Sequence, residues 1–165
     1  MAAPAAESPE IPSWLNNEFF QGALESDFPG IRVRSTHVEA AVAVGENYAC
    51  IVYRAIVGRE EGADLSLIIK VLPTAEFRAQ MVREGEITLR EVRMYKETLE
   101  LLGDPCNHPK CFYAVLDNVR DAVVLEDLRP KGYKTRDRKL GLDFVHAKLV
   151  MEQIGSLHGS GIALR

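Results

Sequence analysis

A single lysine interrupts the apolar run LSLIIKVLP at residues 65–73. Side chains alternate along a strand, so Lys70 shares one side with Ser66, Ile68 and Leu72. On an exposed edge strand such a lysine would simply face water. If Lys70 is instead partly buried, its ammonium needs a carboxylate partner, because an unpaired buried charge is costly. An ammonium held in this way is a good donor to phosphate oxygens.

The carboxylate partner is expected from the following helical segment, which contains TLREVRMY. Glu91 lies next to Val92, at the margin of the apolar stripe, and one turn before Tyr95. Glu84 and Glu86 are rivals, but their place at the start of the segment suits the helix N-terminus. A strand lysine paired with a helix glutamate is an arrangement that positions a lysine against the phosphates of ATP.

The turn VGENYAC is a candidate for a loop that covers those phosphates. Gly45 would let the backbone approach a phosphate closely, and the N–H groups of Glu46, Asn47 and Tyr48 could donate to it. The alternative is an ordinary hairpin turn.

The stretch VVLEDL is a candidate for a segment that contacts adenine. Glu126, Asp127 and Leu128 follow an apolar run, where an extended backbone could offer N–H and C=O groups to the base. The alternative is that these acidic residues only begin a loop.

The hydrophobic pattern predicts the elements that must position these residues. Strands are expected within 31–44, 48–57, 65–72, 110–117 and 121–128. A short helix is expected from Thr74 to about Met81, followed by a longer one that ends at Gly103. The predicted class is therefore α+β, with a five-stranded antiparallel sheet and one packed helix.

Two further helices are expected at the ends of this pattern. Residues 13–25 suit a short amphipathic helix that Ser13 caps. Residues 142–161 suit a longer helix with Asp143 as its N-cap. The second of these does not obviously belong to the sheet layer.

Composition excludes several classes of protein. The 165 residues are 47% apolar and 27% charged, which is typical of a globular chain rather than a disordered one. A net charge of −4 does not favour nucleic acid or an anionic membrane as partner. The sequence has neither an apolar run long enough to span a bilayer nor a secretory signal. The three cysteines fit a reducing, cytoplasmic setting.

Two local patterns carry weaker alternatives. Cys106, His108 and Cys111 lack the fourth ligand of a tetrahedral zinc site, so loop cysteines are favoured and no metal site is predicted. The basic stretch RPKGYKTRDRKLG could bind nucleic acid or phospholipid, but it has no interleaved aromatic residues and no recognition helix.

Taken in order, GENYAC, LIIKVLP, EVRMY, VVLEDL, GYKTRDRKLGLD and LVMEQIGSLHGSG resemble the ecdysteroid-kinase-like family of insects. That family carries a CHK kinase-like domain, related to choline and aminoglycoside kinases. The resemblance implies an ATP-dependent phosphotransferase with a two-lobed, protein-kinase-like fold. Its acceptor would be an ecdysteroid or a similar hydroxylated small molecule.

The resemblance also implies roles for the residues above. Lys70 and Glu91 would hold the phosphates beneath the Gly45–Tyr48 loop, and Glu126–Leu128 would be the adenine-contacting hinge. Cys50 stands where such families often have serine, which exchanges a good hydroxyl donor for a weak thiol one.

No catalytic or metal-binding residue is assigned in this chain. The resemblance places the family's catalytic H-G-D loop and its Mg²⁺-binding aspartate beyond the last helix. LHGS at 157–160 is similar to the start of that loop, but it has serine in place of the aspartate and comes too soon after the hinge, so His158 is interpreted as structural. Residues 1–12 are rich in proline and alanine and are expected to be a disordered N-terminus. The resemblance implies 13–128 as an N-terminal lobe and 129–165 as the start of a truncated C-terminal lobe. Such a chain is expected to be inactive alone and to self-associate through its last helix. A non-catalytic module that binds ATP or regulates a relative is the alternative.

Overall fold

The computed structural model describes residues 9–42, 50–72, 80, 84–117, 119–137 and 139–164. Its strands are β1 (Val33–Ala40), β2 (Ile51–Arg59), β3 (Leu65–Val71), β4 (Cys111–Val115) and β5 (Ala122–Glu126). Its helices are α1 (Asn17–Leu24), α3 (Ile87–Arg93), the π-helix η1 (Met94–Thr98), α4 (Leu99–Leu101), the 3-10 turn η2 (Arg129–Lys131) and α5 (Phe144–Ala163). The predicted α+β class is confirmed.

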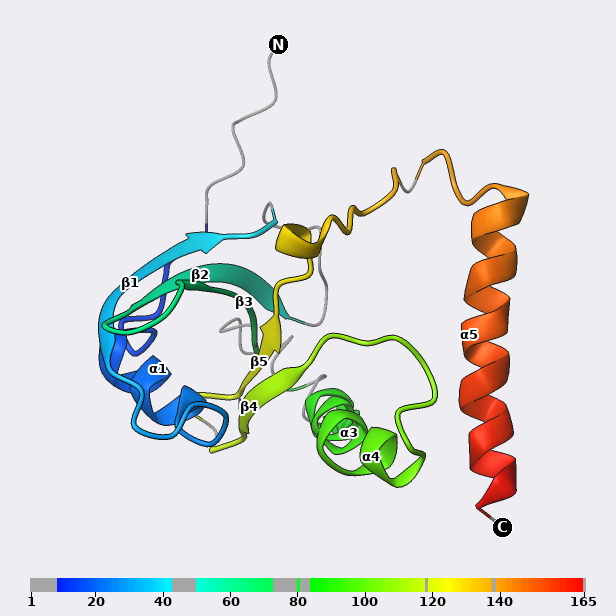
Figure 1. Ribbon diagram of the computed structural model, residues 1–165, viewed down its shortest axis with the longest axis horizontal. Coiled ribbons are helices and arrows are strands. Elements are labelled where there is room, and N and C mark those ends of the chain that lie inside the picture. The colour runs from blue at the N-terminus through cyan, green and yellow to red at the C-terminus, as the bar shows by residue number, and fades with distance from the viewer. Residues whose placement is uncertain are drawn as a thin grey trace.

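The strands form one antiparallel sheet in the order β1-β2-β3-β5-β4 (Figure 1). The strand that carries Lys70 is therefore central, with β2 on one side and β5 on the other. This position excludes the alternative that Lys70 lies on an exposed edge strand. The sheet curves strongly, and α1 lies within its curve (Figure 1).

One face of the sheet and α1 together make the hydrophobic core. Phe20 and Leu24 of α1 are completely buried, as are Ala55 of β2 and Ile69 of β3. Every second residue of β3 points into this core, so its burial alternates as the sequence predicts. The opposite side of β3 carries Ser66, Ile68 and Lys70 and is only partly covered.

The start of α1 differs from the sequence-based prediction. Asn16, rather than Ser13, caps the helix, and its side-chain oxygen accepts a hydrogen bond from the Phe19 N–H at 3.1 Å. The prediction for Ser13 was wrong because both residues are good caps, and the one closer to the apolar pair Phe19–Phe20 forms the contact. The Ser13 carbonyl instead accepts a hydrogen bond from the Asn16 side chain at 3.2 Å.

The longer predicted helix is present but is not a regular α-helix. It begins after Glu86, which has a left-handed backbone with φ of 53°, and it widens to a π-helix between α3 and α4. Leu99 is buried at its far end, and Gly103 follows with φ of +72°, as expected for a glycine that ends a helix. The predicted short helix from Thr74 lies almost entirely outside the described residues.

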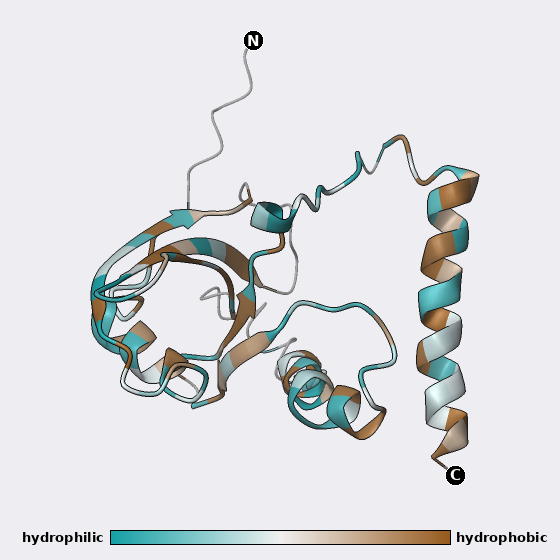
Figure 2. Cartoon of the chain, in the orientation of Figure 1, coloured by the Kyte–Doolittle hydropathy of each residue, from teal (hydrophilic) through white to brown (hydrophobic). Residues whose placement is uncertain are grey.

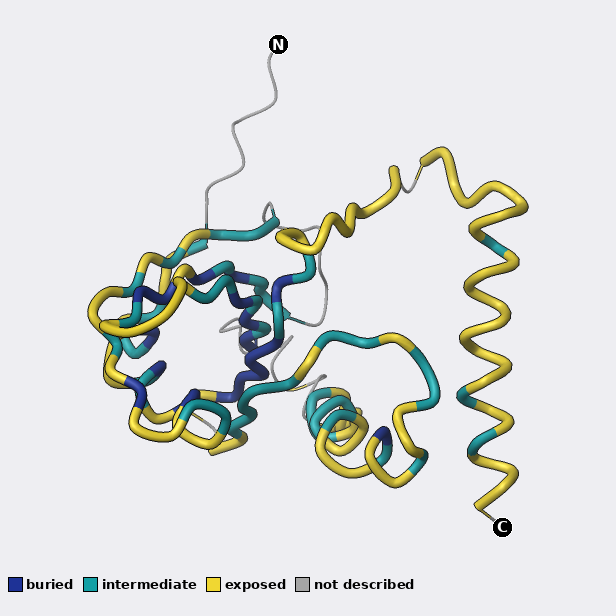
Figure 3. Tube along the Cα trace, viewed as in Figure 1, coloured by how far each residue is buried: buried dark blue, intermediate teal, exposed yellow. Residues whose placement is uncertain are grey.

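The last helix, α5, is separated from the sheet by an exposed connection (Figure 1). Asp143 caps α5 as predicted, because its carboxylate accepts a hydrogen bond from the His146 N–H at 2.9 Å. Figure 2 shows hydrophobic residues along α5, and Figure 3 shows that almost all of this helix is exposed. Among the described residues, hydrogen bonds join α5 to the segment before β4 from Ser156 Oγ to the Pro105 carbonyl and from the Asn107 N–H to Gln153 Oε1. None of the described helices could span a membrane.

Candidate functional site

The partly covered face of the sheet brings together residues from three strands. In the observed register Val52 of β2 lies opposite Lys70 of β3, and Val123 of β5 lies opposite Lys70 on the other side. Ile68 and Leu125 form the next pair on this face. An apolar strip thus runs beside a lysine at the centre of the sheet.

Lys70 meets Glu91 of α3, as the sequence predicts. Its Nζ donates a hydrogen bond to Glu91 Oε1, and the two groups form an ion pair. The lysine side chain keeps 33% of its accessible surface and the glutamate side chain keeps 27%. The ammonium is therefore neither free in solvent nor sealed, and it can donate further hydrogen bonds to a ligand.

The environment keeps Lys70 charged. Burial alone would lower the pKa of its ammonium, but the hydrogen bond and charge of Glu91 outweigh burial and raise that pKa above its usual value. Burial raises the pKa of the nearby Cys50 thiol, and it also raises the pKa of the Tyr95 hydroxyl. Lys70 is therefore a cation beside a thiol and a phenol hydroxyl that are neutral at pH 7.

The rival carboxylates have other contacts. Glu86 lies 3.8 Å from Arg90 in a local helix pair, and Glu84 accepts a hydrogen bond from Gln80 at 2.7 Å. Glu91 stands farther along the helix, which brings it over β3. The prediction that Glu91, rather than Glu84 or Glu86, forms the ion pair with Lys70 is confirmed.

Two acidic side chains with different surroundings lie at the end of β5: Glu126 is its last residue, and Asp127 follows it. Glu126 pairs with Lys131 at 2.5 Å, and its carboxylate has a lowered pKa, first because of the hydrogen bond from Lys131. Asp127 is 6% exposed and faces the sheet. The Glu126 N–H donates to the Lys110 carbonyl at 2.8 Å, and the Asp127 N–H donates to the Ser66 carbonyl at 3.2 Å.

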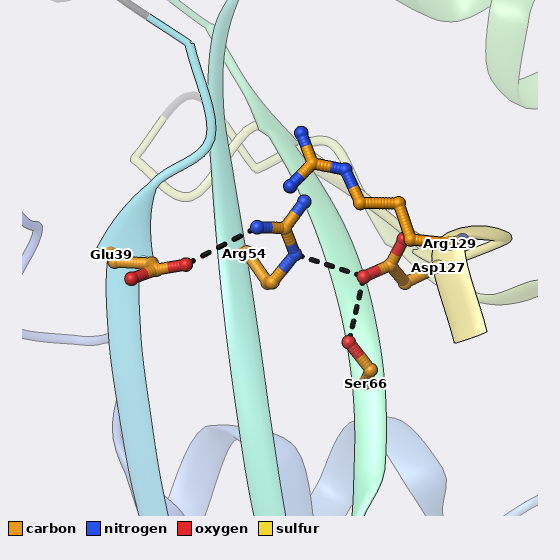
Figure 4. Close-up of polar contacts among 5 residues, drawn as sticks. All are labelled: Glu39, Arg54, Ser66, Asp127 and Arg129. Atoms are coloured by element: carbon orange, nitrogen blue, oxygen red, sulfur yellow. Dashed lines mark hydrogen bonds and ion pairs between the residues drawn. The ribbon is translucent and has the colours of Figure 1, made fainter. Parts of the chain in front are cut away.

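Asp127 belongs to a polar cluster that the sequence reasoning missed (Figure 4). Its carboxylate accepts hydrogen bonds from Arg54 Nε at 2.9 Å, from Ser66 Oγ at 2.7 Å and from the Arg129 N–H at 3.0 Å. Burial would raise the pKa of Asp127, but these hydrogen bonds hold it below its usual value. The signal in the sequence was Arg54, a cation in an apolar strand just as Lys70 is.

Gly45, Glu46, Asn47 and Tyr48 lie outside the described residues. The structure does describe the residues on either side of this segment, up to residue 42 and from residue 50. The Ala41 N–H donates to the Val52 carbonyl at 2.9 Å, so the chain leaves the sheet next to the residue that faces Lys70.

The remaining candidates contact other groups of the same chain. His108 contacts Asp104 at 3.2 Å, and among the described residues no group of three or more His, Cys, Asp or Glu side chains could hold a metal ion. In the basic stretch after β5, Lys131 pairs with Glu126, and Arg136 lies 3.4 Å from Asp143. The cations of that stretch are therefore partly neutralised by acids of the same chain.

The fold and the ion pair together define a class of protein. A five-stranded antiparallel sheet, whose central strand carries a lysine paired with a glutamate of a helix that follows this strand, is a kinase-like N-terminal lobe. The family model for the ecdysteroid kinase-like family matches residues 44–165. The chain therefore belongs to the ecdysteroid kinase-like family, a kinase-like phosphotransferase family. Searches of curated proteins and of solved structures give no match to the chain.

Proposed function

We propose that this chain supplies the nucleotide-binding part of an ATP-dependent phosphotransferase that acts on a hydroxyl group of a small molecule. The observation that carries the proposal is the half-exposed ion pair of Lys70 with Glu91 on the central strand. In this proposal Glu91 fixes the lysine, and the free donors of the ammonium bind phosphate oxygens of ATP.

The surroundings of Lys70 fit the other parts of a nucleotide. Val52 and Ile68 lie on the same face of the sheet and are partly exposed, so they offer an apolar surface to a purine ring, and Leu125 beside Ile68 is buried. Beyond Leu125, the backbone of Glu126 and Leu128 would pair with the edge of adenine. The Asp127 carboxylate is already bound to its own chain, so its part would be to hold this backbone. The contribution of Gly45–Tyr48 to phosphate binding, expected from the sequence, stays part of the proposal.

The wider assignment follows family membership and stays a proposal. The acceptor would be an ecdysteroid or a related alcohol, and residues 13–128 and 129–165 would belong to two different lobes. Magnesium would accompany ATP, and the proposal assigns it no ligand among the described residues. The cysteines Cys50, Cys106 and Cys111 are free thiols, which suits a cytoplasmic location. Self-association through the exposed α5 also stays a prediction.

A non-catalytic module that binds ATP is the second candidate. It is favoured by the place of the LHGS stretch, residues 157–160, which lies inside helix α5 and so does not supply the family's catalytic loop. Transfer of labelled phosphate from ATP to an ecdysteroid by the purified chain would exclude it. Binding of ATP without transfer would favour it.

The direct test of the proposal is nucleotide affinity. Titration with a fluorescent ATP analogue should give saturable binding to the unaltered chain. Lys70→Met should weaken it about tenfold or more, because a charge-assisted hydrogen bond contributes about 1.5–3 kcal/mol. Lys148→Met is the matched control, since Lys148 is exposed on α5 and pairs only loosely with Glu152 at 3.7 Å. Equal affinity of the Lys70 and Lys148 variants would contradict the proposal.

A further inference from the structure

The polar cluster around Arg54 lies at one end of the same sheet face (Figure 4). Arg54 of β2 reaches Asp127 through Nε at 2.9 Å and Glu39 of β1 through Nη1 at 3.2 Å. Ser66 of β3 donates to the same Asp127 oxygen at 2.7 Å. One guanidinium thus ties two strands to the stretch that follows β5. The planar fork of arginine suits this double contact, whereas a lysine ammonium is a single point charge.

These contacts fix the centre of the Glu126–Leu128 stretch. Both carboxylate oxygens of Asp127 are engaged, one by Arg54 and Ser66 and the other by the Arg129 N–H. On the backbone, the N–H groups of Glu126 and Asp127 donate to Lys110 and Ser66. The Glu126 carbonyl and the Leu128 N–H take no part in these contacts. The contacts of Asp127 nevertheless fix the directions of these two groups. Asp127 lies between Glu126 and Leu128, and both its carboxylate and its backbone N–H are hydrogen-bonded.

We propose that Arg54 is a positioning residue for base recognition: through Asp127 it fixes the Glu126–Leu128 backbone and so makes the site prefer adenine to guanine. This inference rests on the proposed nucleotide-binding function. Adenine presents an amino donor beside a ring-nitrogen acceptor. Guanine presents a carbonyl acceptor beside an N–H donor at the same positions. A rigid backbone that offers C=O and then N–H matches the first order and opposes the second, whereas a loosened backbone can turn to suit either.

The experiment compares three ligands and four forms of the full chain. ATP, GTP and inorganic tripolyphosphate are titrated into the unaltered chain, Arg54→Lys, Asp127→Asn and Arg34→Lys. Arg34 is the matched control, because it is an exposed strand arginine that lies 3.9 Å from Asp64. Arg54→Lys and Asp127→Asn keep size and polarity, and far-UV circular dichroism at the titration temperature checks that all four forms are folded.

The expected result is a selective loss. Arg54→Lys and Asp127→Asn should reduce the preference for ATP over GTP about three- to tenfold, the value of about one hydrogen bond. Affinity for tripolyphosphate should stay unchanged, because its contacts lie at Lys70. Arg34→Lys should change nothing.

Three results would overturn the inference. An unchanged ATP-to-GTP ratio in both variants would show that Arg54 only stabilises the fold. A parallel loss for all three ligands, tripolyphosphate included, would indicate general damage to the site rather than loss of base recognition. Failure of the unaltered chain to bind ATP at all would overturn the proposed function, and this inference with it.

Discussion

Arg54 and Lys70 make the same kind of contact in two different environments. Both lie on neighbouring strands and point to the same face, and each pairs with a carboxylate from a later element. The side chains of Arg54 and Asp127 keep only 13% and 4% of their surface, whereas those of Lys70 and Glu91 keep 33% and 27%. The first pair is covered by its own chain, and the second remains partly accessible to solvent.

This difference teaches how one motif serves two purposes. When one partner of a buried ion pair is lost, the other charge stays buried without compensation, which is strongly destabilising. The two side chains of such a pair are therefore held together, and so are the backbone segments that carry them. A half-exposed pair can exchange its contact for water and stabilises the fold much less. We therefore interpret Arg54–Asp127 as a structural ion pair that stabilises the fold and Lys70–Glu91 as part of the binding surface.

The largest effect is expected from breaking the buried pair. Arg54→Met should lower the free energy of unfolding by about 3–5 kcal/mol, because it leaves the Asp127 carboxylate buried without its cation. Urea denaturation followed by circular dichroism measures this change.

The double variant Arg54→Met, Asp127→Leu is the control for this prediction. It removes both charges, so it should recover much of the lost stability. If the single Arg54→Met variant lowers the free energy of unfolding by less than about 1 kcal/mol, the two ion pairs do not differ in how much they stabilise the fold.

The two pairs also differ in how well the sequence predicted them. Glu91 lies 21 residues after Lys70, in a helix that follows β3, and the helix pattern placed it toward the sheet. Asp127 lies 73 residues from Arg54, and only the insertion of β5 beside β3 brings the two together. Local patterns predict neighbours in the chain, but not which strand is inserted between two others.

The strands and their faces could be predicted for a similar reason. Alternation along β3 depends on each residue's own hydrophobicity, and it placed Lys70 on the correct side. The π-helix η1 had no such signal, because the spacing of Leu89, Tyr95 and Leu99 also suits a regular α-helix. The cap at Asn16 was missed because two good capping residues lie three positions apart.

An intermediate effect on the free energy of unfolding is expected when the pH is lowered and Asp127 is protonated. The pKa of folded Asp127 lies below that of an unfolded aspartate, about 3.9. Ionised Asp127 therefore stabilises the fold fully above that pH, and this contribution is lost as pH falls through the lower folded value. The difference in unfolding free energy between the unaltered chain and Asp127→Asn should be full at pH 6 and should shrink below about pH 4. A difference that stays constant down to pH 2 would mean that the charge of Asp127 does not stabilise the fold.

The smallest change in stability is expected from the half-exposed pair. Lys70→Met should lower the free energy of unfolding by no more than about 1 kcal/mol, because Glu91 can turn to water once its partner is gone. Glu91→Gln should behave in the same way in urea denaturation, since it keeps the shape of the side chain and removes only its charge. The same two variants should nevertheless weaken ATP binding, Lys70→Met more than Glu91→Gln, because only the first removes the donor itself. If Lys70→Met instead lowers the free energy of unfolding as much as Arg54→Met does, then both ion pairs are structural. In that case the exposure of a pair does not distinguish a charge that binds a ligand from one that stabilises the fold.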